Sequence, residues 1–243
     1  MKDVIILGPG RTGSSFLAGL ISHNRFYINS EQIEARRAYP DGDYENPELI
    51  DLNKKLFFAS GYDHHKIRYG RSVDIHAMKN LARGNELEEF RAFIQKCAQN
   101  RPWLWKDPRL CYTIHFWQKF LNFTDINVIF ITRDHYQIFR SYTKHQVPLT
   151  KREIYEKYDK QLLTVENFLQ TNGLDALRIH FNEFKDKPSL IDKLNQFLGT
   201  DITMDDYRAI HRTNISKKES EVRFWLRYGF GLGKLKITRM LGI

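Results

Sequence analysis

The sequence predicts an α/β fold in which helices flank a central, mostly parallel sheet in three layers. Two apolar runs, over residues 4–7 and 127–132, have the length and composition of buried parallel strands, and residues 177–181 are a third expected strand. Each run precedes a segment with the apolar spacing of a helix that buries one face. Strands that alternate with helices in this way form right-handed crossovers around one sheet. A chain of 243 residues can bury such a core without disulfide bonds.

The remaining elements follow from local signals. Thr150 and Glu153 form a capping-box pattern that opens a long helix, and Gly199 ends the last expected helix. Pro108 suits the first position of a helix. Residues 60–72 are polar and contain glycines, which predicts a surface loop. The other expected elements are short strands at 26–28 and 103–105 and helices at 14–22, 47–59, 86–98, 109–121, 135–144 and 190–198.

We expect one domain over residues 1–243, with a helical insertion at about 39–100 and a basic C-terminal tail at 212–243. The chain carries 38 Lys or Arg and 29 Asp or Glu, a net charge of +9. The tail holds eight Lys or Arg and only two Glu, so it carries most of this excess. Such a charge suggests an anionic ligand, a nucleic acid or an anionic membrane surface as partner.

The tail has three candidate roles. Residues 222–243 combine aromatic side chains with five cations and no acid. A segment of this kind can pack on the core, help to hold a phosphate, or make weak contact with a membrane surface. We favour packing and phosphate binding, because charges interrupt its apolar residues. The sequence contains no recognised base-reading motif, so nucleic acid is not expected as a partner.

Cysteine content and hydropathy indicate the compartment. Cys97 and Cys111 are too few for a disulfide scaffold and belong to no CxxC pair, so a thiolate zinc site is not expected. No run approaches the roughly 18 apolar residues that span a bilayer. The N-terminal apolar run is too short for a signal peptide. We therefore expect a cytoplasmic protein.

A glycine-rich turn from Gly8 to Ser15 lies between the first strand and the first helix. Glycines there let the backbone approach a ligand, and the helix N-terminus offers N–H groups, a combination that suits phosphate. The turn matches the motif G-x-x-x-x-G-K-[ST] at Gly8, Gly13 and Ser15, but Ser14 stands where that motif has lysine. Arg11 supplies a cation earlier in the turn. The turn predicts a phosphate-ester site; the alternative is a turn that serves packing alone.

This turn and a second segment resemble the sulfotransferases that use 3′-phosphoadenosine 5′-phosphosulfate (PAPS). In that family a Lys or Arg precedes a [ST]-G-[ST]-[ST] run, which residues 11–15 (RTGSS) resemble. The family's 3′-phosphate segment is a buried strand, an arginine and a serine eight residues later, which resembles residues 128–132, Arg133 and Ser141. The resemblance implies that the nucleotide is held by these residues: Gly10, Arg11, Thr12, Gly13, Ser14, Ser15, Arg133 and Ser141.

The second segment also has a physical rationale of its own. Arg133 follows a strand, at the edge where α/β sheets bind ligands. A guanidinium can donate two parallel hydrogen bonds to a phosphate. Ser141, two helical turns further on, can reach the same anion. The alternative for Arg133 is a surface ion pair, for example with Asp134.

Two more segments resemble the family more loosely, so that the resemblance covers most of residues 1–200. Residues 105–109 (WKDPR) are similar to a K-D-P motif of bacterial and carbohydrate- or tyrosine-directed members. Residues 178–184 (RIHFNEF) resemble the strand and "YEDL" element before the family's last helix. The K-D-P likeness favours a sugar or glycan hydroxyl as acceptor. Lys217 or Lys218 could supply the basic group that the family places near the 3′-phosphate.

Sulfuryl transfer is an in-line displacement that depends on positioning and on stabilised charge. Arg11 and Lys106 are the expected cations of the reacting centre. The alternative for Lys106 is a plain helix start, with Asp107 as its N-cap. Related enzymes use a Glu or a His as base, and Glu31 is our first candidate because many members carry a Gly-Glu near that position. The alternatives are His64, His65 and His76, and no metal is expected.

The resemblance thus implies an enzyme that moves a sulfuryl group from PAPS to an acceptor hydroxyl and releases adenosine 3′,5′-bisphosphate. One alternative is a P-loop kinase or NTPase that uses residues 128–134 as an acidic strand motif for Mg²⁺. The missing loop lysine counts against it. A basic nucleic-acid-binding protein is the other alternative. The sulfotransferase hypothesis requires Arg133 and the turn at residues 10–15 to lie on the same side of the molecule.

Overall fold

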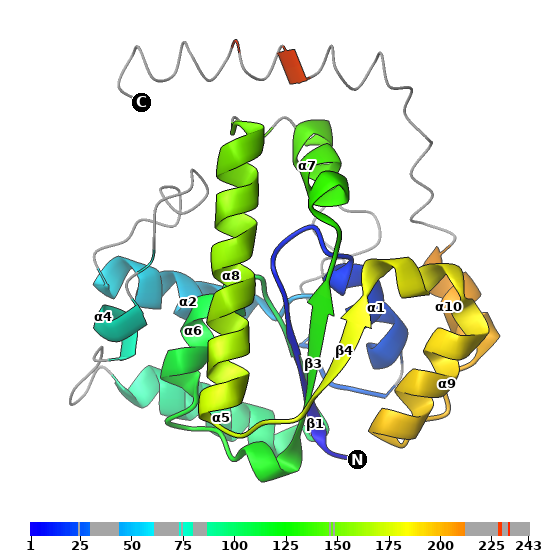
Figure 1. The fold of residues 1–243 in the computed structure, drawn as a ribbon. Coiled ribbons are helices and arrows are strands. Elements are labelled where there is room, and N and C mark those ends of the chain that lie inside the picture. Colours follow the sequence, from blue (N-terminus) through cyan, green and yellow to red (C-terminus); the bar gives the residue numbers. More distant parts are fainter. Residues whose placement is uncertain are drawn as a thin grey trace.

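A computed structural model confirms the α/β fold. It describes every residue except 24, 30–43, 61–72, 74, 80–86, 146, 148, 212–227, 230–232 and 234–243. Within it, four strands pair in parallel in the order β2-β1-β3-β4. The labelled strands accordingly run in one direction in Figure 1. Their bounds are β1 Asp3–Leu7, β2 Leu104–Lys106, β3 Ile126–Thr132 and β4 Ala176–His180.

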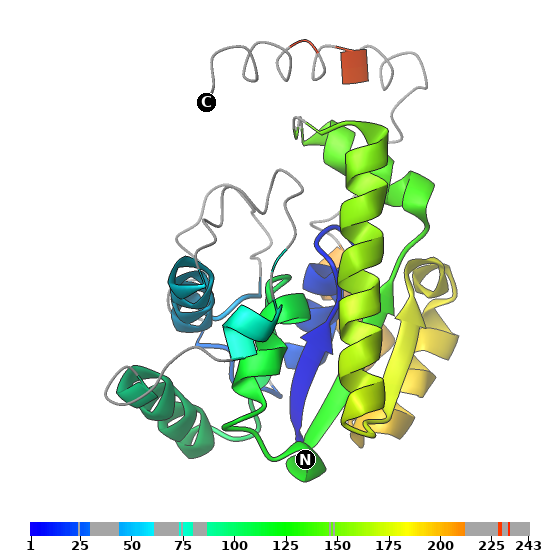
Figure 2. The same ribbon diagram turned by 60° about the vertical axis from the view of Figure 1, so that its left-hand side comes forward.

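Helices cover both faces of the sheet, as Figures 1 and 2 show. One face carries α1 (Ser14–Ser22), α9 (Lys187–Leu198) and α10 (Met204–His211). The other carries α2 (Pro47–Ala59), α4 (Ile75–Lys79), α5 (Glu88–Gln99), α6 (Leu110–Trp117) and α8 (Lys151–Thr171). Helix α7 (His135–Lys144) rises beyond the end of β3, and the 3₁₀ turns η3 (Phe123–Asp125) and η4 (Phe181–Lys185) precede β3 and follow β4. In the part of the chain described here, no helix is both long and apolar enough to cross a bilayer.

Alternate residues of each strand supply two separate cores. On β1, Val4 and Ile6 belong to the cluster that α1 and α9 complete, whereas Ile5 and Leu7 belong to the cluster on the other face. All four side chains are buried. Burial on both faces is what makes parallel strands read as continuous apolar runs, which is why these strands could be predicted.

Several boundaries agree with the sequence prediction. The helices expected at 14–22, 47–59 and 135–144 have these bounds. Thr150 and Glu153 form both hydrogen bonds of the capping box at the start of α8. Gly199 ends α9 in the left-handed conformation, with φ 66°.

Other predictions need correction. The strand expected at 103–105 is Leu104–Lys106, so Lys106 closes the strand instead of following it. Residues 26–28 form no strand, and only Tyr27 makes an isolated bridge, to Trp103. The strand expected to end at Phe181 ends at His180, because Phe181 begins η4.

The helix after β2 also starts later than expected. Pro108 lies in a turn before α6, not at its first position. The Asp107 side chain accepts from the Arg109 N–H over 2.9 Å, and the Asp107 carbonyl accepts from the Leu110 N–H over 2.9 Å. These bonds form a tight turn that delays the helix. The short helix α10 was not predicted.

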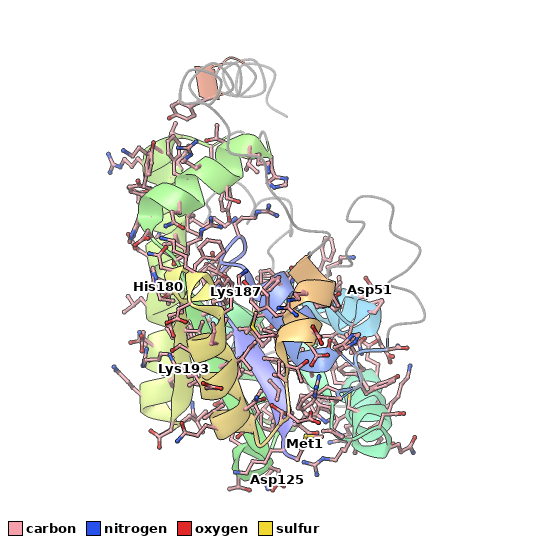
Figure 3. All side chains as sticks on the ribbon, turned by 90° about the vertical axis from the view of Figure 1, so that its right-hand side faces the viewer. Met1, Asp51, Asp125, His180, Lys187 and Lys193 are labelled. Atoms are coloured by element: carbon pink, nitrogen blue, oxygen red, sulfur yellow. The ribbon has the colours of Figure 1, made fainter. Side chains whose placement is uncertain are left out.

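The strand order marks the carboxyl edge of the sheet as the place where a ligand is expected to bind. The chain moves from β1 to β2 on one side and then to β3 on the other side of β1. Such a reversal leaves a crevice at the carboxyl ends of the strands. In Figure 3, His180 marks this end of β4, while Met1 and Asp125 lie toward the opposite end. The turn after β1 and the residues after β3 therefore share the expected edge.

We expect Gly8→Ala to destabilise the protein by about 1–3 kcal/mol through overpacking. A Cβ at Gly8 would lie 2.6 Å from Ile131 Cγ2 and 2.7 Å from the Ile131 carbonyl oxygen, because β1 and β3 approach closely where the turn begins. Urea unfolding measures the change. Gly10→Ala is the control, since its Cβ would meet Pro108 at an ordinary 3.7 Å. Equal stability of the two variants would contradict the close approach.

Candidate functional site

The conformation of the turn after β1 is fixed by residues of the turn itself. Gly13 has φ 96°, in the left-handed region that favours glycine, and serves as N-cap of α1. Arg11 also has a positive φ, 74°. The buried Thr12 hydroxyl donates to the Pro9 carbonyl oxygen over 2.8 Å. The Thr12 side chain thus closes the turn from within, which leaves its neighbours to meet a ligand.

Helix α1 directs its N-terminus at this turn. Among the described side chains, none caps the first N–H groups of the helix. Ser14 is buried, whereas Ser15 is half-buried and its hydroxyl accepts from the Lys106 ammonium over 2.8 Å. The first turn of α1 therefore combines open backbone donors, the positive end of the helix dipole and a lysine from β2.

Two aromatic residues of η4, Phe181 and Phe184, pack against the turn after β1. A Cβ on Gly13 would lie 2.8 Å from both the Phe181 and Phe184 rings, so only glycine fits beside them. The Arg133 guanidinium carbon lies 3.6 Å from the centre of the Phe181 ring. Phe181 thus contacts both the turn and the arginine, and cation–π attraction stabilises the arginine there.

Arg133, the residue after β3, reaches to the turn. Its Nη1 donates to the Arg11 carbonyl oxygen over 2.9 Å, and its Nε donates to Gln137 Oε1 over 3.0 Å. Among the described residues, Arg133 forms no salt bridge with Asp134, whose carboxylate lies 3.5 Å from His180 Nε2. That carboxylate instead accepts from Gln137 and Asn182 over 2.9 Å each. The requirement that Arg133 lie beside residues 10–15 is therefore met.

Tyr158 of α8 fixes the backbone of Arg133. Its hydroxyl accepts from the Arg133 N–H over 2.7 Å and donates to the Arg133 carbonyl oxygen over 2.6 Å. Burial raises the pKa of this hydroxyl to about 12, so it stays protonated at neutral pH. The Tyr158 hydroxyl thus provides hydrogen-bond partners for both the N–H and the carbonyl group of Arg133, in the connection between β3 and α7.

We expect Tyr158→Phe to lower the free energy of unfolding by about 1–3 kcal/mol, because it leaves two backbone groups of Arg133 without partners. Thermal unfolding by circular dichroism measures the loss. Tyr155→Phe, one turn earlier on the same helix, is the matched control and should change stability by less than about 0.5 kcal/mol. A Tyr158→Phe variant as stable as the control would mean that water replaces the hydroxyl.

Arg11 extends from the turn to helix α7. Its Nε donates to Ser141 Oγ over 3.1 Å, and its Nη2 contacts His145 Nε2. Ser141, the serine eight residues after Arg133, therefore meets the turn directly. The two predicted parts of the site are therefore linked through Arg11.

The charges at this edge are unbalanced. Among the described residues, neither Arg11 nor Arg133 contacts a carboxylate. Burial, followed by the nearby Arg11 charge, lowers the pKa of Arg133 to about 10. Burial and the same Arg11 charge lower the pKa of His145 to about 4. The two lowered pKa values mean that the charged forms of Arg133 and His145 are disfavoured, as expected in a cluster of positive groups that suits an anionic ligand.

Lys106 joins the site from β2. Only 3% of its side chain is exposed, and its ammonium contacts Ser15 Oγ at 2.8 Å and Glu45 Oε1 at 2.5 Å. The plain helix-start alternative does not describe this position, since Lys106 is the last residue of the strand and points to the first turn of α1. Glu45, just before α2, was not singled out from the sequence.

Asp107 has a structural role. It is buried, and its carboxylate accepts from Asn53 Nδ2 over 2.8 Å and from the Arg109 side chain over 2.9 Å. Asn53 in turn accepts from Trp117 Nε1 over 2.8 Å. This hydrogen-bond network links α2 and α6 to the turn after Lys106. It thereby fixes the backbone position from which the Lys106 side chain extends.

Several predicted residues cannot be placed. Glu31, His64 and His65 lie outside the described residues, as do most of the expected loop at 60–72 and most of the tail. His76 is exposed on α4. The expectation that the protein binds no metal stays a prediction.

One described residue of the tail packs on the body of the protein. The Tyr228 ring lies 4.9 Å from the Phe139 ring of α7, centre to centre. Its hydroxyl accepts from the Lys151 N–H at the start of α8 over 3.2 Å. This contact agrees with the role in packing that we favoured for the tail.

The structure adds residues that the sequence analysis missed: Gln137, His145, Tyr158, Phe181 and Glu45. Two of them had a local signal: Gln137 stands four residues after Arg133 and His145 four residues after Ser141, a spacing at which helical side chains are neighbours. Glu45, Tyr158 and Phe181 come from other segments, where no spacing rule links them to the site.

Fold and site together define an α/β protein with a doubly covered parallel sheet and with Arg11, Lys106 and Arg133 grouped near the carboxyl ends of β1, β2 and β3. Protein-family models, curated proteins and solved structures were all compared with the chain, and none matches it. The function must therefore be argued from the residues themselves.

Proposed function

We propose that this protein is a sulfotransferase that uses PAPS as donor and a hydroxyl group as acceptor. The observation that carries the proposal is that Arg11 contacts both Arg133 and Ser141: its carbonyl oxygen accepts from Arg133, and its side chain donates to Ser141. The spacing of these residues suggested the family, and the fold brings them together from three elements. Two uncompensated guanidinium groups beside a helix N-terminus suit a ligand with more than one phosphate.

The residues fit the nucleotide in distinct ways. Arg133 and Ser141 would hold the 3′-phosphate, and the N–H groups of residues 13–15 would hold the 5′-phosphate. When bound, PAPS supplies the activated sulfuryl group. Arg11 and Lys106 provide positive charge near the phosphate that leaves, which would stabilise the charge that develops in the transition state. Lys106 also orients the Ser15 hydroxyl.

The acceptor side of the reaction rests on the family resemblance. It assigns the base to Glu31, with His64, His65 and His76 as alternatives, and favours a sugar or glycan hydroxyl. Glu45 is a further carboxylate of the crevice, paired with Lys106.

Two measurements test this proposal. Calorimetry should detect binding of adenosine 3′,5′-bisphosphate, with weaker binding of adenosine 5′-monophosphate, which lacks the 3′-phosphate. Incubation with ³⁵S-labelled PAPS and a panel of glycans and phenols should then give a labelled product without added Mg²⁺. ATP hydrolysis without bisphosphate binding would favour a P-loop kinase or NTPase instead. Steeply salt-dependent RNA or DNA binding without nucleotide binding would favour a nucleic-acid-binding protein.

A further inference from the structure

Helix α7 presents two polar side chains to Arg11, not one. Ser141 and His145 are four residues apart, so they project from the same side of the chain as it leaves the helix. Arg11 Nε donates to Ser141 Oγ over 3.1 Å, while Arg11 Nη2 contacts His145 Nε2. The same guanidinium therefore spans both, and His145 lies beside the group that Ser141 is proposed to bind.

The surroundings keep His145 neutral in the free protein. Among the described residues, the charged groups that act on its ring are Arg11 and Lys144, and neither is acidic. Burial, then the charges of Arg11 and Lys144, lower the pKa of His145 to about 4. At neutral pH the Nε2 atom is therefore an acceptor for the Arg11 N–H, and the proton of the ring belongs on Nδ1.

A phosphate bound beside His145 would favour the protonated imidazole and would change Nε2 from an acceptor to a donor. Its negative charge would offset those of Arg11 and Lys144, which favours the protonated form of a nearby imidazole. Arg11 would turn its N–H groups to the phosphate oxygens, which are stronger acceptors than imidazole. The Nε2 atom would lose its donor and could itself become a donor to the phosphate.

We propose that His145 is a further phosphate ligand of this site and that it takes up a proton when the phosphate binds. This inference rests on the proposed function, because the ligand is the 3′-phosphate of the nucleotide. The proton comes from solvent: neutral imidazole and one proton give imidazolium, which donates through Nε2 to the phosphate. No covalent bond forms, and the proton returns to solvent when the nucleotide leaves.

Calorimetric titration with adenosine 3′,5′-bisphosphate in buffers of different ionisation enthalpy measures the protons exchanged on binding. The phosphate can itself release a proton, since its second pKa is near 6. Wild type must therefore be compared with His145→Gln, in which the phosphate contribution stays the same. If binding restores the ordinary histidine pKa of about 6.5, the ratio of wild-type to variant affinity should rise about ten-fold from about pH 8 to about pH 5.5.

A direct readout separates this role from a merely structural one. In protein labelled at histidine, the Cε1–H resonance that His145→Gln removes should titrate near pH 4 without nucleotide and well above it with nucleotide. His23→Gln serves as control, because His23 lies at the far end of α1, where it faces Asp206 at 3.8 Å. The control should leave proton uptake and affinity unchanged.

The outcomes are distinct. Bisphosphate binding with the same proton exchange in wild type and His145→Gln, or an unchanged titration of the His145 resonance, would overturn the role of His145 and leave the proposed function standing. Absence of bisphosphate binding by the wild type would overturn both. A selective loss of proton uptake in His145→Gln would support the inference.

Discussion

Replacement of Arg133 by alanine should weaken the binding of adenosine 3′,5′-bisphosphate about 30- to 150-fold, which corresponds to about 2–3 kcal/mol for a lost charged hydrogen-bonding partner. Arg133→Lys should recover only part of the affinity, since an ammonium keeps the charge but not the two-pronged geometry of the guanidinium. Calorimetry at fixed ionic strength measures both changes. Arg11→Ala should weaken binding in the same direction.

The stability of the free protein distinguishes a ligand-binding arginine from a structural one. Arg133 repels Arg11 and has no carboxylate partner among the described residues, so its removal should cost little stability despite the contact with Phe181. Arg178→Ala is the matched control from the neighbouring strand, because Arg178 pairs with Glu166 over 2.5 Å and 2.8 Å, away from the crevice. The control should leave bisphosphate affinity unchanged. An unaltered affinity in both Arg133→Ala and Arg11→Ala would defeat the site assignment.

Replacement of Lys106 by methionine should lower sulfuryl turnover roughly 100- to 1,000-fold, the size of effect seen when one preorganised donor is removed from a reacting centre. The affinity for adenosine 3′,5′-bisphosphate should fall far less, because Arg133, Ser141 and the turn still hold the phosphates. Labelled-product formation under saturating PAPS measures turnover, and calorimetry measures affinity.

Loss of this buried cation also removes the Lys106 ion pair of Glu45, so we expect the single variant to lose stability. Breaking a buried ion pair costs about 3–5 kcal/mol, and only 14% of the Glu45 side chain is exposed. The double variant Lys106→Met/Glu45→Gln removes both charges and should restore stability. If turnover returns together with stability, Lys106 is structural. If stability returns and turnover does not, Lys106 acts on the reaction.

Much of the fold was accessible from the sequence for a local reason. Most residues of β3 form a buried apolar run, and helices such as α7 and α8 repeat apolar residues along one face. The capping box of Thr150 and Glu153 involves residues three positions apart. These signals depend on neighbours within a turn or two, so no knowledge of distant contacts is needed.

The errors in element boundaries arise from contacts between residues that are far apart in the sequence. Residues 103–106 contain apolar side chains at every position before Lys106, and lysine has no preference for a strand interior. Only pairing with β1 extends the strand to Lys106, whose partner there is Ile6. The delayed start of α6 arises from the side chain of Asp107, which is tied to Asn53 more than fifty residues away.

The sequence by itself determined the strand–turn–helix units, the glycine-rich turn and the eight-residue spacing between Arg133 and Ser141, because each is encoded within a short stretch of chain. Only the tertiary structure decided that Arg11 reaches Ser141 and His145, that Lys106 meets Ser15, and that Phe181 packs beneath both Gly13 and Arg133. These contacts join residues from different strands and helices, and they exist because the parallel sheet brings the carboxyl ends of β1, β2, β3 and β4 to one edge.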